Sequence, residues 1–473
     1  MSLTEDLLYI VLTHLTRGEK VRLCAISSNV YEAITRTIYR DINLCSIASI
    51  LSFHASTIEN ASERTYRLLQ LVESFRCVCY RNIVDFRIAA IVQALPNIIT
   101  LDIGSASDRS QSEGAETIGH AISSRTKLLH LALKSVNTIT LEQLKSSTSS
   151  NLQSFQIGDN MNYIRRATNW IITLLPTIRA LIIPDFVMWG IISRVIDSTA
   201  GPFPNVHFLA ACDGDDQQHS VGTDLVRVFP GLRALSMEYQ RDQMGQMEHI
   251  HRMLPHLRYL HVLPHQVRRE FVSTDHKITR VAFQGSRSFG GGPRADFASE
   301  HLRSFASPSV RSVKTCVEVK PLNSGLEILG TSFLGLVNLD LSLRQHRTGA
   351  KLVELFTIDL AATLPESLIS LVVRWTNEYG QYELPISVQA MHTFVQGSPI
   401  GQNGAMLRVL RVQCIQPQHG WRVAWRIDRN GETAILHAID WDLGDIIVAK
   451  FAPELRRYDE NYLGAPPWIR LDE

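Results

Sequence analysis

The chain has 473 residues, of which 45% are hydrophobic and 20% charged, and its 47 basic and 46 acidic side chains give a net charge of +1. This length exceeds the usual size of a single-core domain, so we expect several domains or one elongated array. The balanced charge excludes the concentrated basic excess that favours nucleic acid or an anionic membrane as partner. No apolar run approaches the ~20 residues that a membrane-spanning helix needs.

The cysteines and the N-terminus indicate where the protein works. The seven cysteines are an odd number, lie mostly inside apolar runs and show no paired spacing. This pattern is typical of reduced core thiols in an intracellular protein. Glu5 and Asp6 stand near the start, with no basic segment before an apolar run, so the N-terminus does not resemble a signal peptide. We therefore expect a cytoplasmic or nuclear protein.

Three short helices are predicted within the first 44 residues. A capping box of Ser2 and Glu5 would start the first helix, whose apolar residues fall on one face. A second helix would carry Val21 and Leu23, and a third would open near Asn29. So small a unit cannot bury all of its apolar surface unaided. We therefore expect it to present an apolar face to a partner.

This segment resembles an F-box. The opening phrase of that family, L-P-x-E-L-L-x-x-I-L-x-x-L, is matched by Leu3, Leu7, Leu8, Val11, Leu12 and Leu15. The stretch 39–44 also resembles family members that carry a repeat domain behind the box. The chain departs from the family at Asp6 in place of glutamate, at Thr4 in place of proline, and at Gly18-Glu19-Lys20 in place of an acidic turn. The alternative is a helical cap that seals the end of a repeat array.

The resemblance implies docking on the Skp adaptor of a cullin-based ubiquitin ligase. The residues that it assigns to adaptor binding are Leu3, Leu7, Val11, Leu12, Leu15, Val21 and Leu23. The rest of the chain would then hold a protein substrate, with no chemistry of its own. The alternative function is a scaffold or adaptor that works outside ubiquitination.

From residue 95 onward a short phrase recurs. A small residue or proline is followed by apolar residues two, five and seven places later, as in Pro96, Ile98, Leu101 and Ile103. The middle apolar residue of successive copies falls at positions 101, 131, 155, 181, 209, 235, 260, 281, 313, 339, 371 and 410. Such a period predicts a solenoid, whose units bury their apolar faces only by stacking. The phrase resembles a leucine-rich repeat.

Each phrase ends like a strand and is followed by a helix. Leu101 and Ile103 alternate with polar residues, as a strand with one buried face requires. Helical spacing follows in several connections, at residues 163–175, 188–196, 244–254 and 352–364. The predicted fold class is therefore α/β: a three-helix F-box followed by an irregular leucine-rich-repeat solenoid with a parallel concave sheet and outer helices.

The predicted organisation has four parts. They are an F-box at 1–44, a helical linker and N-terminal cap at 45–94, an array of about 12 irregular repeats at 95–415, and a C-terminal cap and tail at 416–473. Within the linker, residues 47–58 and 66–72 are expected to be helical and residues 75–80 to form a short first strand. Within the last part, Arg429-Asn430-Gly431 signals a β-hairpin.

Neither a metal site nor an enzyme active site is predicted. His249, His251, His256, His261 and His265 cluster around one repeat, but no cysteine or carboxylate set completes a ligand group. The sequence contains no nucleophile elbow and no phosphate-binding loop. We expect no cofactor.

The concave face of the C-terminal half is the predicted substrate surface. Residues just before and between the buried strand positions should face a partner, and here they are largely basic or aromatic: Tyr259, His261, Arg280, Lys314, Arg374 and Arg411. Guanidinium groups pair bidentately with carboxylate and phosphate. The predicted partner is therefore an acidic or phosphorylated protein segment, and ordinary solvated strand surface is the alternative.

Overall fold

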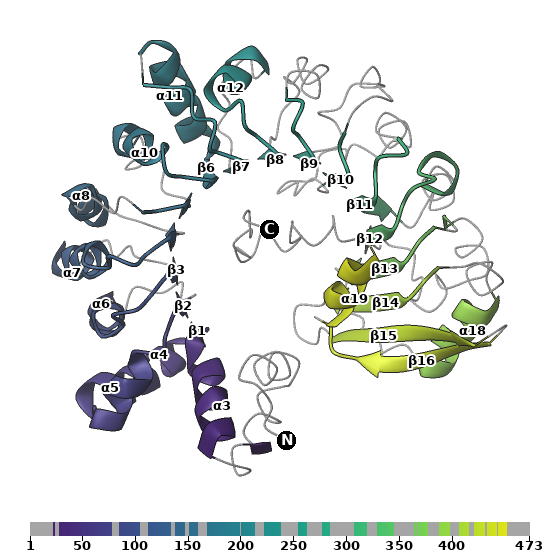
Figure 1. Ribbon diagram of the computed structural model, residues 1–473, viewed down its shortest axis with the longest axis horizontal. Helices are drawn as coiled ribbons and strands as arrows, with labels where there is room; N and C mark the ends of the chain where they lie inside the picture. Colours follow the sequence, from purple (N-terminus) through teal and green to yellow (C-terminus); the bar gives the residue numbers. More distant parts are fainter. Residues whose placement is uncertain are drawn as a thin grey trace. The chain divides into compact units, whose positions relative to one another are not determined.

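Figure 1 shows the computed structural model of the chain. It describes residues 22–23, 28–77, 85–104, 112–133, 138–146, 151–158, 168–198, 200–212, 222–237, 254–262, 277–283, 307–318, 329–344, 364–365, 367–376, 387–397, 406–415, 421–430, 433–441 and 443–451. The chain divides into two compact units, the first ending near residue 215 and the second containing most of the chain beyond it. Each unit is described by itself.

Unit 1 alternates short strands with helices. Its elements are α3 (Ser28–Arg40), β1 (Asp41–Leu44), α4 (Ile47–His54), η1 (Ala55–Glu59), α5 (Glu63–Leu69), β2 (Ser74–Cys77), α6 (Asp85–Gln93), β3 (Thr100–Ile103), α7 (Ser112–Ser123), β4 (His130–Leu133), α8 (Thr138–Ser146), β5 (Ser154–Ile157), α10 (Thr168–Leu174), β6 (Ala180–Pro184) and α11 (Asp185–Ile196). Strands β1 to β6 pair parallel, each with the next in the sequence. Helices α6 to α11 lie on one side of these strands (Figure 1).

The parallel register stacks the apolar residues of successive repeats. Phe75, Leu101, Leu131, Phe155 and Leu181 stand opposite one another across five strands, and all are buried. One buried face on each strand, covered by helices, accounts for the α/β character of the unit.

Unit 2 continues the pattern and closes it with a hairpin. Its elements are α12 (Gly222–Val228), β8 (Ala234–Met237), β9 (Tyr259–Val262), β10 (Arg280–Phe283), β11 (Ser312–Glu318), β12 (Asn338–Arg344), β13 (Ser370–Thr376), α18 (Val388–Gly397), β14 (Val409–Ile415), β15 (Trp421–Asn430), β16 (Thr433–Ile439) and α19 (Leu443–Phe451). Strands β8 to β14 pair parallel, whereas β14, β15 and β16 pair antiparallel. A further strand, β7 (Phe208–Cys212), contains residues of both units.

One backbone arrangement recurs in every well-described repeat. The carbonyl oxygen of the residue before a strand accepts two hydrogen bonds from the next repeat. One comes from the amide of the equivalent residue, and the other comes from the amide of the residue after it. In unit 1 the oxygen of Glu73 accepts from Ile99 at 2.7 Å and Thr100 at 2.9 Å. In unit 2 the oxygen of Arg233 accepts from Arg258 at 2.7 Å and Tyr259 at 3.1 Å. The side chains that flank each strand are therefore held at equivalent positions from repeat to repeat.

Most of the expected repeat architecture is present. All twelve middle positions of the phrase, from Leu101 to Leu410, lie in strands β3 to β14. The hairpin expected around Arg429 is confirmed as β15 and β16. The helices expected at 47–58 and 188–196 are confirmed by α4 with η1 and by α11. Of the helices expected at 244–254 and 352–364, residues 244–253 and 352–363 lie outside the described residues.

The start of the sheet differs from the expectation. The parallel ladder begins at β1, whose Ile42 stands opposite Phe75 of β2. The first strand expected at residues 75–80 corresponds to β2, which is the second strand of the ladder. Residues 41–44, which resemble the end of an F-box, therefore also form the first described strand. Among the described residues, no helix is both long and apolar enough to cross a bilayer. Among the described cysteines, Cys77 and Cys414 are buried and form no disulfide bond.

Removing a buried leucine from the array should destabilise it. Leu235 of β8 is fully buried, so Leu235→Ala is expected to lower the free energy of unfolding by about 2–5 kcal/mol. Leu334 is 72% exposed, so the matched change Leu334→Ala should alter it by less than about 0.5 kcal/mol. Urea denaturation followed by circular dichroism compares the two variants, and equal losses would contradict the assigned core.

Candidate binding surface

The sheet of unit 2 aligns one residue from each of strands β8 to β14. These residues stand opposite one another between the buried apolar positions of their strands, and we call them the inner row: Ser236, His261, Ala282, Lys314, Asp340, Val372 and Arg411. Two predicted basic contacts, Lys314 and Arg411, belong to this row, whereas Arg374 lies two residues further along β13 than Val372, the member of the row on that strand. The sequence predicts a basic surface here. Its chemistry is set by interactions between neighbouring strands.

His261 is a neutral side chain in this row. It is buried and shares a hydrogen bond of 2.8 Å between Nδ1 and Oγ of Ser236 on the preceding strand. Burial, with a smaller contribution from the positive charge of Lys314, lowers the pKa of His261 to about 3. The imidazole is therefore uncharged near neutral pH and does not add to a basic surface.

The charge of Arg374 is matched within the sheet. Its Nε lies 2.9 Å from Oδ1 of Asp340 and its Nη2 lies 2.9 Å from Oδ2, which forms a bidentate pair. Its Nη1 donates to Oε1 of Gln413 on the next strand at 3.0 Å. Asp340 is fully buried, and the Arg374 side chain is 22% exposed. The pair orients both groups and removes most of the net charge at this position.

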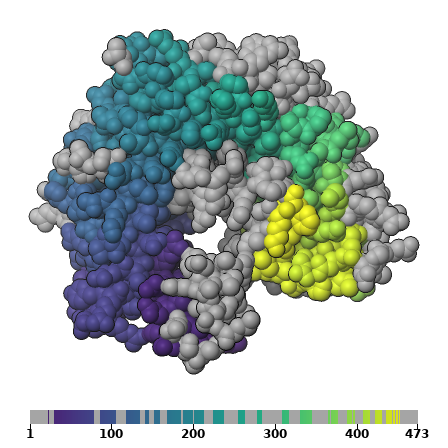
Figure 2. Space-filling model, viewed as in Figure 1, coloured from purple at the N-terminus to yellow at the C-terminus, as the bar shows by residue number. Residues whose placement is uncertain are grey.

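Arg411 is covered by the chain that follows the hairpin. The guanidinium carbon of Arg411 lies 5.6 Å from the ring centre of Trp441, and that of Arg422 lies 5.9 Å from the same ring. A Cβ atom placed on Gly444 would lie 3.1 Å from Cδ of Arg411, so α19 passes directly over this face of β14. Val448 of α19 joins a cluster with Val409. Figure 2 shows the yellow C-terminal part of unit 2 beside its green part.

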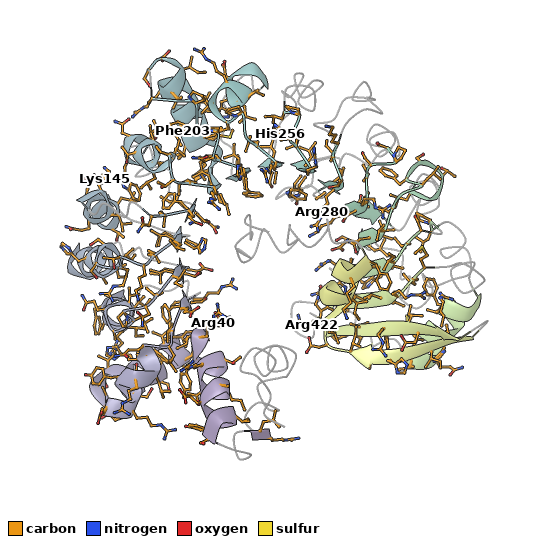
Figure 3. All side chains as sticks on the ribbon, viewed as in Figure 1. Arg40, Lys145, Phe203, His256, Arg280 and Arg422 are labelled. Carbon is orange, nitrogen blue, oxygen red and sulfur yellow. The ribbon has the colours of Figure 1, made fainter. Side chains whose placement is uncertain are left out.

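The remaining predicted contact residues of unit 2 are also less exposed than expected. Tyr259 and Arg280 stand opposite each other at the first positions of β9 and β10, and only 3% of Arg280 is exposed. Figure 3 labels Arg280 at this place in the sheet. Lys314 is half-buried. The expectation that Tyr259, His261, Arg280 and Arg411 stand exposed is thus wrong, because neighbouring strands and α19 bury them. Their role in substrate binding stays a prediction.

The inner face of unit 1 is likewise neutralised. Nε of Arg76 lies 3.1 Å from Oδ2 of Asp102, which is buried on the adjacent strand. Burial lowers the pKa of His130 to about 4. No uncompensated charge excess is evident among these three residues.

A pocket of about 400 Å³ lies at the N-terminal end of unit 1. It is bounded by the end of α3, strand β1, and the helices that follow, with Ile38, Phe53 and Leu68 among its apolar walls and Thr57 among its polar ones. The pocket contains no cluster of catalytic side chains, since Tyr39 and Asp41 are the ionisable residues among its described lining. It therefore resembles an incompletely filled end of the apolar core more than a catalytic cavity.

The residues predicted to bind an adaptor are mostly outside the described part of the chain. Leu3, Leu7, Val11, Leu12, Leu15 and Val21 lie there, and Leu23 is described as half-buried. The third expected helix is present as α3, with Ile34 fully buried.

Of the clustered histidines, His256 is exposed and His261 buried, and the described residues contain no group of three potential metal ligands.

Sequence reasoning missed a second row of residues in unit 2. The residue immediately before each strand, from β8 to β14, forms what we call the edge row: Arg233, Arg258, Thr279, Arg311, Val337, Ile369 and Arg408. Its signal in the sequence is the position directly after the first apolar residue of the phrase. Arg233 is exposed, and Arg258 and Arg311 are partly so.

Comparison with known proteins adds one distant likeness. No protein-family model and no curated protein matches the sequence. Among solved structures, the chain is similar to the leucine-rich repeat-containing protein LegL7 from Legionella pneumophila, at 12% identity and a TM-score of 0.33, over 54% of this chain and 87% of that one. The repeat architecture of this chain rests on its own strand pairing.

Breaking the Asp340–Arg374 pair should destabilise unit 2. Asp340→Ala leaves a partly buried guanidinium without its carboxylate, so we expect a loss of about 3 kcal/mol in the free energy of unfolding. The double variant Asp340→Ala/Arg374→Met removes the stranded charge as well and should recover part of this loss. Urea denaturation of both variants tests this, and a double variant less stable than Asp340→Ala would contradict it.

The buried histidine predicts acid sensitivity. The folded chain holds His261 neutral down to a pH of about 3, whereas the unfolded chain protonates it below about 6.5. Unfolding is therefore favoured increasingly as pH falls through 6.5, by about 2 kcal/mol at pH 5 from this residue. His261→Gln should lose less stability than the unmodified protein between pH 7.5 and pH 5. An unchanged pH dependence of the denaturation midpoint would contradict the neutral state.

Proposed function

We propose that this protein is the substrate-recognition subunit of a Skp–cullin–F-box type ubiquitin ligase. In this role its N-terminal helices bind the Skp adaptor and its solenoid binds a protein substrate. The chain itself performs no chemistry, and it works in the cytoplasm or nucleus without a cofactor.

The junction between α3 and β1 is the observation that carries the proposal. Helix α3 ends at Arg40 and strand β1 begins at Asp41, with no linker between them. The oxygen of Arg40 accepts the amide of Glu73 at 3.0 Å, and the two side chains form an ion pair at 2.8 Å. A ligase receptor needs its adaptor-binding helices fixed to its substrate-binding sheet, and this junction supplies a rigid connection within unit 1. The F-box resemblance of residues 3–15 and 39–44 supports the same function.

A scaffold or adaptor role outside ubiquitination is the second candidate. It is favoured by the position of α3, which contacts β1 and α5 at the first described strand of the sheet, where a terminal cap would also pack. The two candidates differ in what the residues before α3 do. In a cap they stabilise the sheet, whereas in an F-box they bind a partner.

Capture of a Skp adaptor tests the proposal. The full chain should retain a purified Skp adaptor in a pull-down, and Leu12→Asp should reduce retention at least about tenfold, because a carboxylate would enter the apolar contact. The exposed leucine of the array supplies the matched control, since Leu334→Asp should leave adaptor retention unchanged. A folded chain that retains no adaptor would overturn the proposal.

A deletion separates the two candidates. Removing residues 1–27 leaves α3, β1 and their bonds to β2 in place. An F-box should then lose the adaptor and keep its denaturation midpoint, whereas a cap should lose stability. Removing residues 1–44 would also delete the first strand and confuse the two results.

A further inference from the structure

The edge row differs in chemistry between the two units. In unit 1 the residues at this position are Arg40, Glu73, Ile99, Leu129, Gln153 and Arg179. Its first two charges, Arg40 and Glu73, form an ion pair with each other. In unit 2 the edge row contains four arginines and no carboxylate. The same backbone position is thus mixed or neutral in one unit and strongly basic in the other.

The turns before β9 and β10 differ from those of unit 1 as well. Two residues ahead of the edge row, unit 1 has Asn97, whose amide donates to the oxygen of Gln70 in the preceding turn at 2.8 Å, and Lys127, whose Nζ donates to Oδ1 of Asn97 at 2.7 Å. At this position unit 2 has exposed His256 and exposed Lys277. A histidine and a cation thus stand before β9 and β10 where side chains join neighbouring turns in unit 1, whereas Ser309 and Ser367 of unit 2 keep such a link, each Oγ donating to a carbonyl oxygen of the preceding turn at 3.1 Å. Figure 3 labels His256 at this edge.

Four of these cations come from consecutive repeats, and we call them the basic edge: Arg233, Arg258, Lys277 and Arg311, from strands β8 to β11. Adjacent strands are about 4.8 Å apart, so the basic edge extends over roughly 14 Å. An extended peptide covers that distance with about four or five residues. The three arginine positions are fixed by the backbone bonds that link one repeat to the next, in which the oxygens of Arg233, Arg258 and Arg311 all take part.

The side chains of Arg258 and Arg311 lie along the turns. Nη1 of Arg258 donates to the oxygens of Pro255 at 3.3 Å and Leu257 at 3.1 Å, both in its own turn. Nη1 of Arg311 lies 3.7 Å from where a Cβ atom on Gly335 would stand, in the next turn. A guanidinium has five N–H groups, so Arg258 keeps further donors after these two bonds. Exposure and held geometry together favour contact with an external anion.

We infer that the basic edge of unit 2 binds an extended, anionic segment of a partner protein, rich in carboxylate or phosphoryl groups. The inference rests on the proposed role of the solenoid as the partner-binding part, and it is independent of the F-box. Guanidinium groups in a row with fixed spacing recognise such a segment by bidentate pairing. Prior ordering by the backbone reduces the entropy lost on binding. The inner row is less suited to this task, because its His261 is neutral and its Asp340 is paired with Arg374.

A protein segment fits this edge better than nucleic acid does. The whole chain has a net charge of +1, and the basic edge provides four cations over a short span. Tight nucleic-acid binding depends on neutralising many phosphates along a longer track. Four cations match a short acidic motif.

Binding of labelled peptides to the full chain tests the inference. The probes are a fluorescein-labelled hexaglutamate, the same peptide with two phosphoserines, a hexaglutamine of equal length and a dT12 oligonucleotide. Fluorescence anisotropy should show both anionic peptides binding, the hexaglutamine not binding, and the affinity falling as salt is raised. The triple variant Arg233→Gln/Arg258→Gln/Arg311→Gln should bind the anionic peptides at least about tenfold more weakly. Stronger binding by the phosphorylated peptide would assign phosphoryl groups as the preferred anions.

A matched variant controls for the loss of charge. Arg36, Arg67 and Arg426 are exposed and paired with Glu32, Glu63 and Asp428, so changing these three to glutamine lowers the net charge equally without touching the basic edge. This variant should bind the anionic peptides as the unmodified chain does, and both triple variants should keep their denaturation midpoints. Equal weakening in both variants, no binding of either anionic peptide, or tighter binding of the oligonucleotide would overturn the inference.

Adaptor capture, measured on the same proteins, keeps this test separate from the ligase proposal. The triple variant of the basic edge should retain the adaptor as well as the unmodified chain. Peptide binding without adaptor capture would sink the ligase proposal and leave the basic edge intact. Adaptor capture without peptide binding would do the reverse.

Discussion

One backbone carbonyl oxygen in each repeat links that repeat to the next by hydrogen bonds, and the rest of the structure depends on this link. The residue before a strand accepts two amides from the start of the next repeat, as Glu73 does from Ile99 and Thr100. A single repeat of strand and helix cannot bury its apolar face, so stability depends on stacking the next repeat in register. The shared carbonyl sets that register, and the alignment of Leu101 with Leu131 follows from it. Within each unit, the core is a consequence of this repeated bond.

The same alignment places the polar and charged side chains of successive repeats in rows. A side chain at one position of a repeat stands beside its counterparts, and it either pairs with them or accumulates their charge. Asp340 and Arg374 are 34 residues apart in the sequence and form a bidentate pair, because β12 and β13 are neighbours. Arg233 and Arg258 are also neighbours, but both are cations. The carboxylate of the inner row is therefore compensated within the sheet, whereas the edge row of unit 2 remains basic.

The sequence predicted the strands well because the signal is local. Alternating apolar residues at a fixed offset define a strand with one buried face, and the middle positions of all twelve phrases lie in strands. The sequence also indicated a strand at residues 75–80, where β2 lies, but it did not predict that β1 belongs to the sheet, since β1 does not carry the full phrase. Nor did it predict the burial of Arg411, which depends on Trp441 folding back across β14. Burial of this kind comes from contacts between distant segments, and no single repeat encodes it.

The junction at Arg40 joins helix α3 to the sheet through the same kind of backbone bond. Its carbonyl accepts the amide of Glu73, so the end of α3 occupies the position that the residue before a strand has in every later repeat. Helix α3 is therefore joined to the ladder by the bond type that joins the repeats, and β1 cannot be treated as part of a detachable box. Helix α3 is thereby held against unit 1 at its C-terminal end, beside whatever the residues before it bind. An N-terminal segment joined by a flexible linker would lack this property, because its orientation would vary freely with respect to the sheet.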